Sequence, residues 1–479
     1  MEAEGRQHYN LTLAVLVVAA LAYALQQTMV VPALPALQHD LHTTTAWSTW
    51  LLTAFLLSAS VGTPILGKLG DQYGKERLLL YSLGVFLAGC IGAAAAWDIW
   101  SLIAFRGLQG AAGAIFPLSF SIIRDEFPRE RIGVAIGTVS AIFGVGGSVG
   151  LILSGLIVDN LSWRWIFIIG ATPVAAAVVL VKRFVPESPI KTPSRVDVWG
   201  GALLSILLTC LLVAMTEGDR WGWTSARTLG LFAAAAVFLG VWCAVELRVE
   251  EPMVDMRMLG ARTVLFTNLT AFIAGFAMYS SFVLVPAFVE TPRRLAPSVA
   301  RLVDYGFDAS ATKAGLYLAP GALLMLLAGP ASGRLGRRFG PKWPLALGMT
   351  MIALGIFGLA AYNDHPWEIV IAMGLMSPGV GLAFAAMATL ITQEVRPSET
   401  GVANAVNTVL RTVGGVVGAQ VGATILVVHR IPGTQVPARN GFTTAFGLFG
   451  AAALVGAVAA LLVTPRGFFG RTKPAEGRL

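Results

Sequence analysis

The chain has 479 residues, of which 56% are hydrophobic and only 13% are charged, and its mean hydropathy is +0.73. Soluble domains carry about 25% charged residues, so this composition excludes an ordinary soluble enzyme. The net charge of +8 would suit a nucleic-acid surface on a soluble protein, but it must first be compared with the charge distribution expected of a membrane protein.

Fourteen apolar segments are long enough to cross a bilayer, which takes about 20 mostly apolar residues. In chain order they cover residues 11–33, 47–66, 78–96, 100–122, 133–158, 164–181, 198–216, 228–246, 264–289, 314–332, 343–361, 367–391, 400–427 and 442–464. The first segment is long, lacks a small-residue cleavage site and precedes many others, which is not typical of a signal peptide. Segments of this length are helices rather than barrel strands, so the sequence predicts an all-α integral membrane protein.

The positions of lysine and arginine predict how the spans are oriented. If both termini are cytoplasmic, 23 of the 34 Lys and Arg residues fall in cytoplasmic segments and 9 in outer segments. Positive residues are enriched on the cytoplasmic side of inner membranes, which favours this orientation. The net charge is therefore read as a topology signal, and no nucleic-acid partner is expected.

Two repeated patterns indicate that the chain contains related halves. Residues 67–74 read Gly-Lys-Leu-Gly-Asp-Gln-Tyr-Gly, and residues 333–340, 266 positions later, read Gly-Arg-Leu-Gly-Arg-Arg-Phe-Gly. Residues 133–150 and 401–418 are identical at eight of 18 positions, at an offset of 268. Parallel repeats of this kind occur in transporters built from two fused bundles.

The repeat offset spans eight predicted helices rather than six, so two helices are expected to be inserted between two six-helix bundles. The predicted parts are an N-terminal six-helix bundle (1–181), a cytoplasmic linker (182–197), two inserted transmembrane helices (198–246), a C-terminal six-helix bundle (247–464) and a cytoplasmic tail (465–479).

Four short motifs carry a family resemblance. They are residues 67–77, residues 106–110 (Arg-Gly-Leu-Gln-Gly), residues 163–167 (Trp-Arg-Trp-Ile-Phe) and residues 401–415, which contain Gly-Val-Ala-Asn and end in Gly-Gly. With the 14 spans, they resemble the major facilitator superfamily, specifically its fourteen-span drug:proton antiporter branch. The resemblance covers essentially the whole chain and implies the major facilitator fold.

A carboxylate lies among glycines and basic residues in the first predicted cytoplasmic loop, where the nearby cations stabilise its charge. In the family this loop latches the two halves in one state. The resemblance therefore implies that a group of residues here forms a breakable conformational lock; the alternative is a fixed, solvated turn that only sets topology. The residues of this predicted lock are Gly67, Asp71, Gly74, Lys75, Arg77 and Asp125.

Polar and aromatic residues on helices that the family uses to line its cavity are candidates for substrate contact. They are Gln26, Gln27, Trp50, Arg106, Gln109, Phe116, Tyr279 and Ser281. They would suit an amphipathic cargo that needs few directional contacts; the alternative is lipid-facing aromatics and amides bonded between helices. A charge at the depth of Arg106 costs at least ~2.5 kcal/mol, so this arginine either faces the cavity or bonds to a neighbouring helix.

Small and polar residues on two spans are expected to pack helices closely. They are Gly146, Gly147, Gly150, Gly155, Asn404, Asn407, Arg411, Gly414 and Gly415. Arg411 lies on the same helix face as the two asparagines and is expected to bond across to another helix. The family's antiporter motif G-P-x-x-G-G is altered, because Leu151 and Ser154 replace its proline and one glycine.

Proton coupling normally uses a titratable group within the pathway, and the predicted spans contain no interior carboxylate. The branch usually has an acidic residue on the first span where this chain has Gln26. The candidates at span ends are Asp71, Asp159, Glu290 and Glu394. Without a pathway carboxylate to attract cations, the two interior arginines favour a neutral or anionic lipophilic cargo.

The outer segment 290–313 is longer than in most family members. Val299, Leu302 and Val303 could form a short interfacial helix with Arg301 pointing outward; a plain surface lid is the alternative.

The leading hypothesis is an inner-membrane exporter of lipophilic small molecules that works by alternating access and, as the resemblance implies, is driven by protons. The expected partners are the small-molecule substrate, protons and membrane lipid, and the expected state is a monomer. No phosphate loop, metal-ligand spacing or nucleophile motif points to a cofactor, a metal or an enzyme. The rival hypotheses are a lipid or metabolite transporter, including a self-resistance exporter, with weak or atypical proton coupling, and a non-transporting membrane receptor or scaffold.

Overall fold

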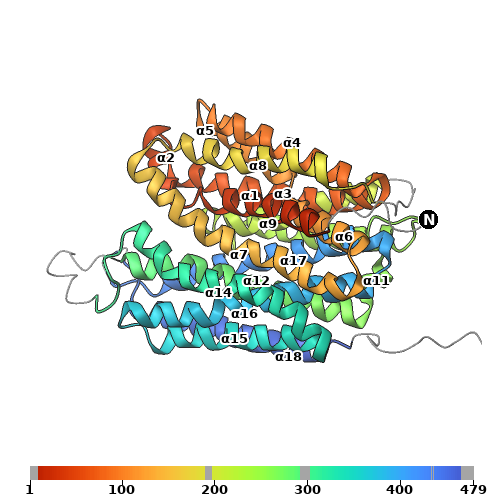
Figure 1. Ribbon diagram of the computed structural model, residues 1–479. Coiled ribbons are helices and arrows are strands. Elements are labelled where there is room, and N and C mark those ends of the chain that lie inside the picture. The colour runs from red at the N-terminus through yellow and green to blue at the C-terminus, as the bar shows by residue number, and fades with distance from the viewer. Residues whose placement is uncertain (1–8, 189–196, 292–302, 433, 435, 465–479) are drawn as a thin grey trace, which may run out of the picture.

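Long helices that run roughly side by side form the whole of the protein body in the computed structural model (Figure 1). The structure describes residues 9–188, 197–291, 303–432, 434 and 436–464. Within these residues, 14 helices are long and apolar enough to cross a membrane. The predicted number of spans and the all-helical class are thus confirmed.

The helices fall into three groups along the chain. The first group contains α1 (Tyr9–Thr28), α2 (Leu34–Asp40), α3 (Thr45–Tyr73), α4 (Lys75–Ala94), α5 (Ile99–Ala111), α6 (Ile115–Glu126), α7 (Arg129–Asn160) and α8 (Arg164–Phe184). Next come the inserted helices α9 (Val198–Trp221) and α10 (Ala226–Glu246), followed by the short α11 (Met256–Gly260). The last group contains α12 (Arg262–Glu290), α14 (Ala311–Phe339), α15 (Lys342–Ala361), α16 (Pro366–Glu394), η1 (Pro397–Glu399), α17 (Thr400–Val428) and α18 (Arg439–Leu461).

The fourth span is two helices, α5 and α6, rather than the single helix expected over 100–122. The break lies beside glycines that bring this span close to α3. A Cβ on Gly113 would lie 2.6 Å from the hydroxyl of Thr63, and a Cβ on Gly110 would collide with the backbone of Phe55. Glycine at both positions lets the two backbones approach.

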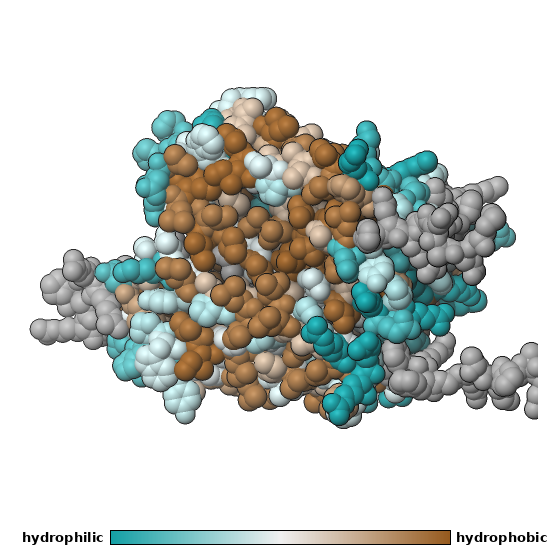
Figure 2. All heavy atoms as spheres, viewed as in Figure 1, coloured by the Kyte–Doolittle hydropathy of each residue, from teal (hydrophilic) through white to brown (hydrophobic). Residues whose placement is uncertain are grey.

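The surface of the bundle is divided into a hydrophobic belt and polar ends (Figure 2). Large apolar side chains such as Leu323 and Leu327 are exposed in the middle of their helix, whereas Trp97, Trp199 and Trp367 are exposed at or near helix ends. Exposed apolar side chains are expected where the solvent is lipid, and tryptophan is enriched at the level of the lipid head groups. The protein is therefore built to lie across a membrane.

Two glycine contacts join the first and last groups of helices at one end of the bundle. A Cβ on Gly67 of α3 would lie 2.9 Å from the carbonyl oxygen of Gly401 of α17, and a Cβ on Gly133 of α7 would lie 3.4 Å from the Cα of Gly333 of α14. These four glycines belong to the sequence repeats, so each repeat packs against the other one in the opposite half. We call this end, which also holds Asp71, the basic end, and the other the opposite end.

Contacts between the groups of helices also continue away from the basic end. Helices α7 and α14 stay in contact along their length, since Gly155 near the end of α7 still packs against Thr312 of α14. Helix α9 packs against both α3 and α17. The inserted helix α9 therefore contributes to the wall between the two groups.

We predict that substituting Gly137 by alanine loosens the α7–α14 contact, because a Cβ there would collide with the backbone of Gly329. Overpacking of this kind costs about 1–3 kcal/mol, so the purified protein in detergent should melt at a lower temperature, as measured by tryptophan fluorescence. Gly84→Ala is the matched control, because a Cβ at Gly84 would meet nothing within 4 Å. Equal melting temperatures for the two variants would contradict this account of the contact.

Candidate functional site

A cavity of about 250 Å³ lies between the first and last groups of helices, in the middle and opposite-end parts of the bundle. Eight helices line it: α1, α3, α5, α7, α9, α12, α14 and α17. Most of the lining is apolar, as at Leu52, Leu212, Val283 and Leu318. A mostly apolar wall with a few polar groups is typical of a site for a lipophilic ligand.

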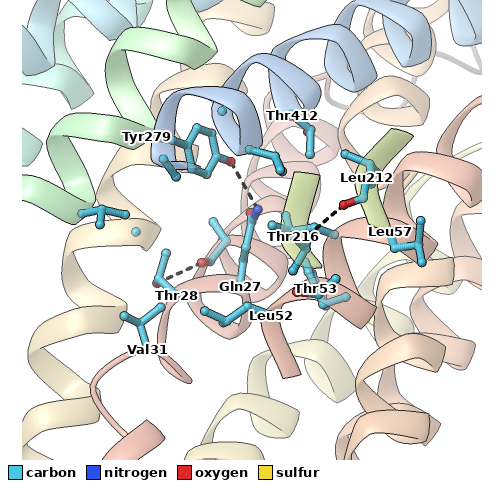
Figure 3. A pocket seen from close by; sticks show the side chains of 18 of the residues that line it. Gln27, Thr28, Val31, Leu52, Thr53, Leu57, Leu212, Thr216, Tyr279 and Thr412 are labelled. Carbon is cyan, nitrogen blue, oxygen red and sulfur yellow. Dashed lines mark hydrogen bonds between the residues drawn. The ribbon is translucent and has the colours of Figure 1, made fainter. Parts of the chain in front are cut away.

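Several of the few polar groups of the main cavity already have hydrogen-bond partners within the protein. Gln27 of α1 donates a hydrogen bond of 3.3 Å to the hydroxyl of Tyr279 of α12, which links the first and last groups across the cavity (Figure 3). The hydroxyls of Thr28 and Thr216 donate to backbone carbonyls within their own helices. The cavity thus offers a ligand few directional contacts and a large apolar surface.

A second, smaller chamber of about 20 Å³ adjoins the main cavity toward the basic end. The two spaces share the lining residues Gln27, Leu56, Phe143, Tyr279 and Thr412. The chamber is also lined by Tyr23, Phe116 and Arg411. Its volume is close to that needed for one water molecule, so an aromatic ring does not fit.

The structure divides the eight candidate substrate contacts into two sets. Gln27, Arg106, Phe116 and Tyr279 line the main cavity or the chamber. The other four line neither space and have polar partners elsewhere: Gln26 donates to the carbonyl of Ile166, Trp50 to Glu217, Gln109 to the sulfur of Cys90, and Ser281 to the carbonyl of Ala277. Amides and tryptophans on inward spans can equally well tie helices together, which the sequence does not distinguish.

Arg106 combines the two roles that the sequence left open. Its Nε donates to the carbonyl of Leu51 at 3.2 Å, and its Nη1 donates to the side chain of Gln109 at 2.6 Å and to the carbonyl of Gln26 at 3.3 Å. The guanidinium also lies over the ring of Phe55, and the residue lines the main cavity. Arg106 therefore joins three helices while placing a positive charge at the cavity wall.

Asp71 makes the contact that crosses between the halves at the basic end. Its carboxylate accepts hydrogen bonds from the backbone N–H of Gly401 at 2.9 Å and of Val402 at 3.2 Å, at the start of α17. The first N–H groups of a helix have no partner within the helix, and the helix dipole favours a negative charge there. Asp71 is only 2% exposed, so it does not lie on a solvated turn.

Lys75 holds two carboxylates together beneath this contact. It is fully buried, forms an ion pair with Asp125 and lies 3.9 Å from Asp71. The expected loop at 67–77 is helical apart from Gly74, whose φ of 125° lets α3 turn directly into α4. Arg77 lies at the rim, where it pairs with Glu187 at 3.5 Å.

Arg124 makes contacts at the basic end that were not predicted from the sequence. Its guanidinium donates to the carbonyls of Val395 at 2.7 Å and Arg396 at 3.2 Å, and to the hydroxyl of Thr400. It thus binds the turn before α17, while Asp71 binds the first N–H groups of the same helix. In the sequence, Arg124 could have been noticed because it lies next to Asp125. Nothing in the neighbouring residues indicates that α17 lies opposite it.

The four candidate proton-coupling residues lie outside both cavities. Asp159 and Glu290 are exposed at the opposite end, Glu394 is the last residue of α16 at the basic end, and Asp71 is buried in the contact with α17. The expectation that no span contains an interior carboxylate needs correction at Glu217. The apolar segment was expected to end at 216, whereas α9 continues to Trp221 and leaves Glu217 only 5% exposed.

The inserted helix α9 contributes directly to the main cavity, which the sequence did not indicate. Leu212 and Thr216 line it. Beyond them, Glu217 accepts a hydrogen bond of 2.7 Å from Trp50 of α3 and Asp219 accepts one from Gln420 of α17. Helix α9 is thus tied to both groups of helices beside the cavity.

The expected packing residues lie at helix contacts, with one difference. A Cβ on Gly146, Gly150, Gly155, Gly414 or Gly415 would collide with a neighbouring helix, whereas one on Gly147 would meet only Thr28 at 3.7 Å. Asn404 donates to Thr392 of α16 and Asn407 to Asn268 of α12. Arg411, expected to bond across helices, instead stacks on the rings of Phe143 and Phe384.

The predicted interfacial helix in the outer segment falls mainly outside the described residues, which resume at 303. From there the chain packs onto the last group of helices. Tyr305 donates a hydrogen bond of 2.6 Å to the carbonyl of Pro437 and lies against Phe288 of α12.

We predict that Lys75→Met strongly destabilises the protein, because it leaves Asp71 and Asp125 buried without their cation. Breaking a buried ion pair typically costs about 3–5 kcal/mol, which thermal unfolding of the purified protein should detect. The matched control is Arg77→Met, whose exposed ion pair is worth at most about 1 kcal/mol. If Lys75→Met and Arg77→Met unfold at the same temperature, the buried charges are not coupled.

The chain was found to be similar to known membrane transporters over most of its length. The model of the Major Facilitator Superfamily matches residues 16–419 and 267–478. Multidrug resistance protein 3 of Bacillus subtilis is 30% identical over 420 residues, covering 86% of this chain and 78% of that protein. The Tetracenomycin C resistance and export protein of Streptomyces glaucescens is 28% identical over 419 residues, covering 86% and 74%.

A solved structure supports the fold. The human organic anion transporter MFSD10 (TETRAN) superposes with a TM-score of 0.67 at 15% sequence identity, covering 94% of this chain and 99% of that chain. At this identity the similarity concerns the fold alone. Given the family model and the relatives, the chain belongs to the major facilitator superfamily and is a membrane transporter rather than an enzyme.

Proposed function

We propose that this transporter exports lipophilic small molecules from the cytoplasm by alternating access, driven by the proton gradient. The observation that carries the proposal is a mostly apolar cavity between two groups of helices that are joined across the basic end. A relative named for multidrug resistance and one named for tetracenomycin C resistance and export support an efflux role.

The proposed membrane is the inner membrane of the cell, with both termini and the basic end on the cytoplasmic side. The lysine and arginine distribution supports this orientation. The structure then corresponds to an outward-facing state, because the contacts of Asp71 and Arg124 with α17 close the cytoplasmic side. We propose a monomer whose two six-helix bundles, 1–181 and 247–464, are the moving bodies, connected through the linker 182–197 and the inserted helices 198–246.

Opening to the cytoplasm requires that the contacts at the basic end break together. The carboxylate of Asp71 must leave the first turn of α17, and the glycine contacts of α3 with α17 and of α7 with α14 must separate. Both contacts are made by glycines, so the helices can close tightly without interlocked side chains. Such a contact can be made and broken in each transport cycle. Gly67, Asp71, Gly74, Lys75, Arg77 and Asp125 are the proposed lock.

Asp71 is the proposed proton-responsive group, ahead of Asp159, Glu290 and Glu394. Adding a proton removes the negative charge that the N-terminus of α17 attracts, which would weaken the closed state. Asp159 and Glu290 lie at the opposite end, and Glu394 lies at the end of α16. Coupling at the lock instead of in the cavity would account for a first span that carries Gln26 where the branch has an acid.

Transport by the purified protein in lipid vesicles with an imposed pH gradient tests the proposal. Ethidium, rhodamine 6G and 1-pyrenebutyrate supply two cationic cargoes and one anionic cargo. At least one should accumulate against its gradient in protein-containing vesicles, and a protonophore should abolish the accumulation. Accumulation that survives the protonophore would refute proton coupling, and no movement of any cargo would count against efflux of lipophilic molecules.

We predict that Asp71→Asn lowers the transport rate at least about tenfold while the protein still inserts into the membrane. The amide keeps the size of the side chain and loses the charge that binds the start of α17. Initial transport rates in vesicles, normalised to the amount of inserted protein, measure the effect. Asp40→Asn, the same change at an exposed residue outside the lock and outside both cavities, is the control and should retain most of the rate. Wild-type rates for Asp71→Asn would exclude the lock.

A further inference from the structure

Two arginine side chains lie at the cavities in the centre of the bundle without an acidic partner. Arg106 of α5 lines the main cavity and Arg411 of α17 lines the smaller chamber. Among the residues that the structure describes, no aspartate or glutamate lines either space. The centre of the transport pathway is therefore positively charged.

Arg411 is the more exceptional of the two. It is only 8% exposed, and its guanidinium makes no hydrogen bond or ion pair with any described residue. Its contacts are with two aromatic rings, at 4.2 Å from the centre of Phe384 and 5.5 Å from that of Phe143. Stacking on a ring leaves the in-plane N–H donors of a guanidinium unused, and a buried charge without a partner is costly.

The surroundings of the chamber suit an anionic group. Tyr23 lines it beside Arg411, and the hydroxyl of Tyr23 has no hydrogen-bond partner among the described residues. Arg106 donates only to neutral oxygens, so its charge is not cancelled and adds to the positive potential. The donors in the chamber therefore lack an acceptor that an anion would supply.

We propose that the preferred cargo is an amphipathic organic anion, with a carboxylate or sulfonate head at Arg411 and Tyr23 and an aromatic or aliphatic body in the main cavity. This inference rests on the proposed function and specifies its substrate class. A guanidinium binds a carboxylate through charge-assisted hydrogen bonds. The chamber of about 20 Å³ is too small for the body of such a cargo, whereas the adjoining cavity of about 250 Å³ is mostly apolar.

The same arrangement disfavours a cationic cargo of equal size. A cation in the main cavity would lose its hydration near two guanidinium groups and would find no carboxylate among the described lining residues. Leaving a charge desolvated and unpaired is a common way to reject a ligand. Charge, rather than shape, is therefore the proposed basis of selection.

Equilibrium binding to the purified protein in nanodiscs tests this inference with three probes that share one ring system. They are 1-pyrenebutyrate, 1-pyrenebutanol and 4-(1-pyrenyl)butyltrimethylammonium, which are anionic, neutral and cationic, detected by energy transfer from tryptophan. The wild-type protein should bind the anion at least about tenfold more tightly than the cation. Arg411→Gln should weaken anion binding about tenfold and change binding of the neutral probe less than twofold.

Matched variants separate recognition from folding. Arg411→Lys should retain part of the anion preference because it keeps the charge, and Tyr23→Phe should weaken the anion alone, by a few-fold. Arg227→Gln removes an exposed charge outside the cavities and should change nothing. Unchanged binding of the neutral probe shows that a variant is folded.

The inference is overturned if the anion binds no more tightly than the other two probes, which includes no binding at all, or if Arg411→Gln weakens all three equally. These outcomes differ from failure of the proposed function. A protein that transports ethidium in vesicles but shows no anion preference keeps its efflux role and loses this inference. A protein that binds the anion through Arg411 but moves no cargo keeps the inference about binding and loses the efflux role.

Discussion

Close backbone contact at the basic end determines where the cavity lies. Gly67 meets Gly401 and Gly133 meets Gly333, so the two halves approach there as closely as their backbones allow. Asp71 adds a charged contact with the start of α17 at the same level. With this end closed, the space between the halves remains in the middle and opposite-end parts of the bundle, and the cavity is found there.

The sequence repeat has a direct structural counterpart in these contacts. The copies at 67–74 and 333–340 pack against 401–418 and 133–150, respectively. The glycines are shared, but the charge is reversed at equivalent positions. Asp71 accepts from N–H groups at the start of α17, whereas Arg337 donates at 3.4 Å to the carbonyl of Glu130 at the start of α7. The two related contacts thus differ in their charged groups, and in the proposed cycle the α3–α17 contact is the regulated one.

The inserted helix α9 and the central arginines set the chemical character of the cavity. Helix α9 supplies Leu212 and Thr216 to the cavity and is tied to α3 through Glu217. The wall of the main cavity is mostly apolar, and Arg411 places a positive charge in the adjoining chamber. An apolar cavity with a cationic base is the physical ground for the substrate class that we infer.

The sequence alone determined the class, the 14 spans and the repeat, because span length and apolar content are imposed by the bilayer and can be counted along the chain. The family resemblance of the first predicted cytoplasmic loop also marked Asp71, Lys75 and Asp125. The sequence did not show that Asp71 binds the backbone of Gly401, that Gln26 and Trp50 face neighbouring helices, or that Glu217 is buried. Those facts depend on which helices become neighbours and how each is rotated, and only the packing of residues hundreds of positions apart decides that.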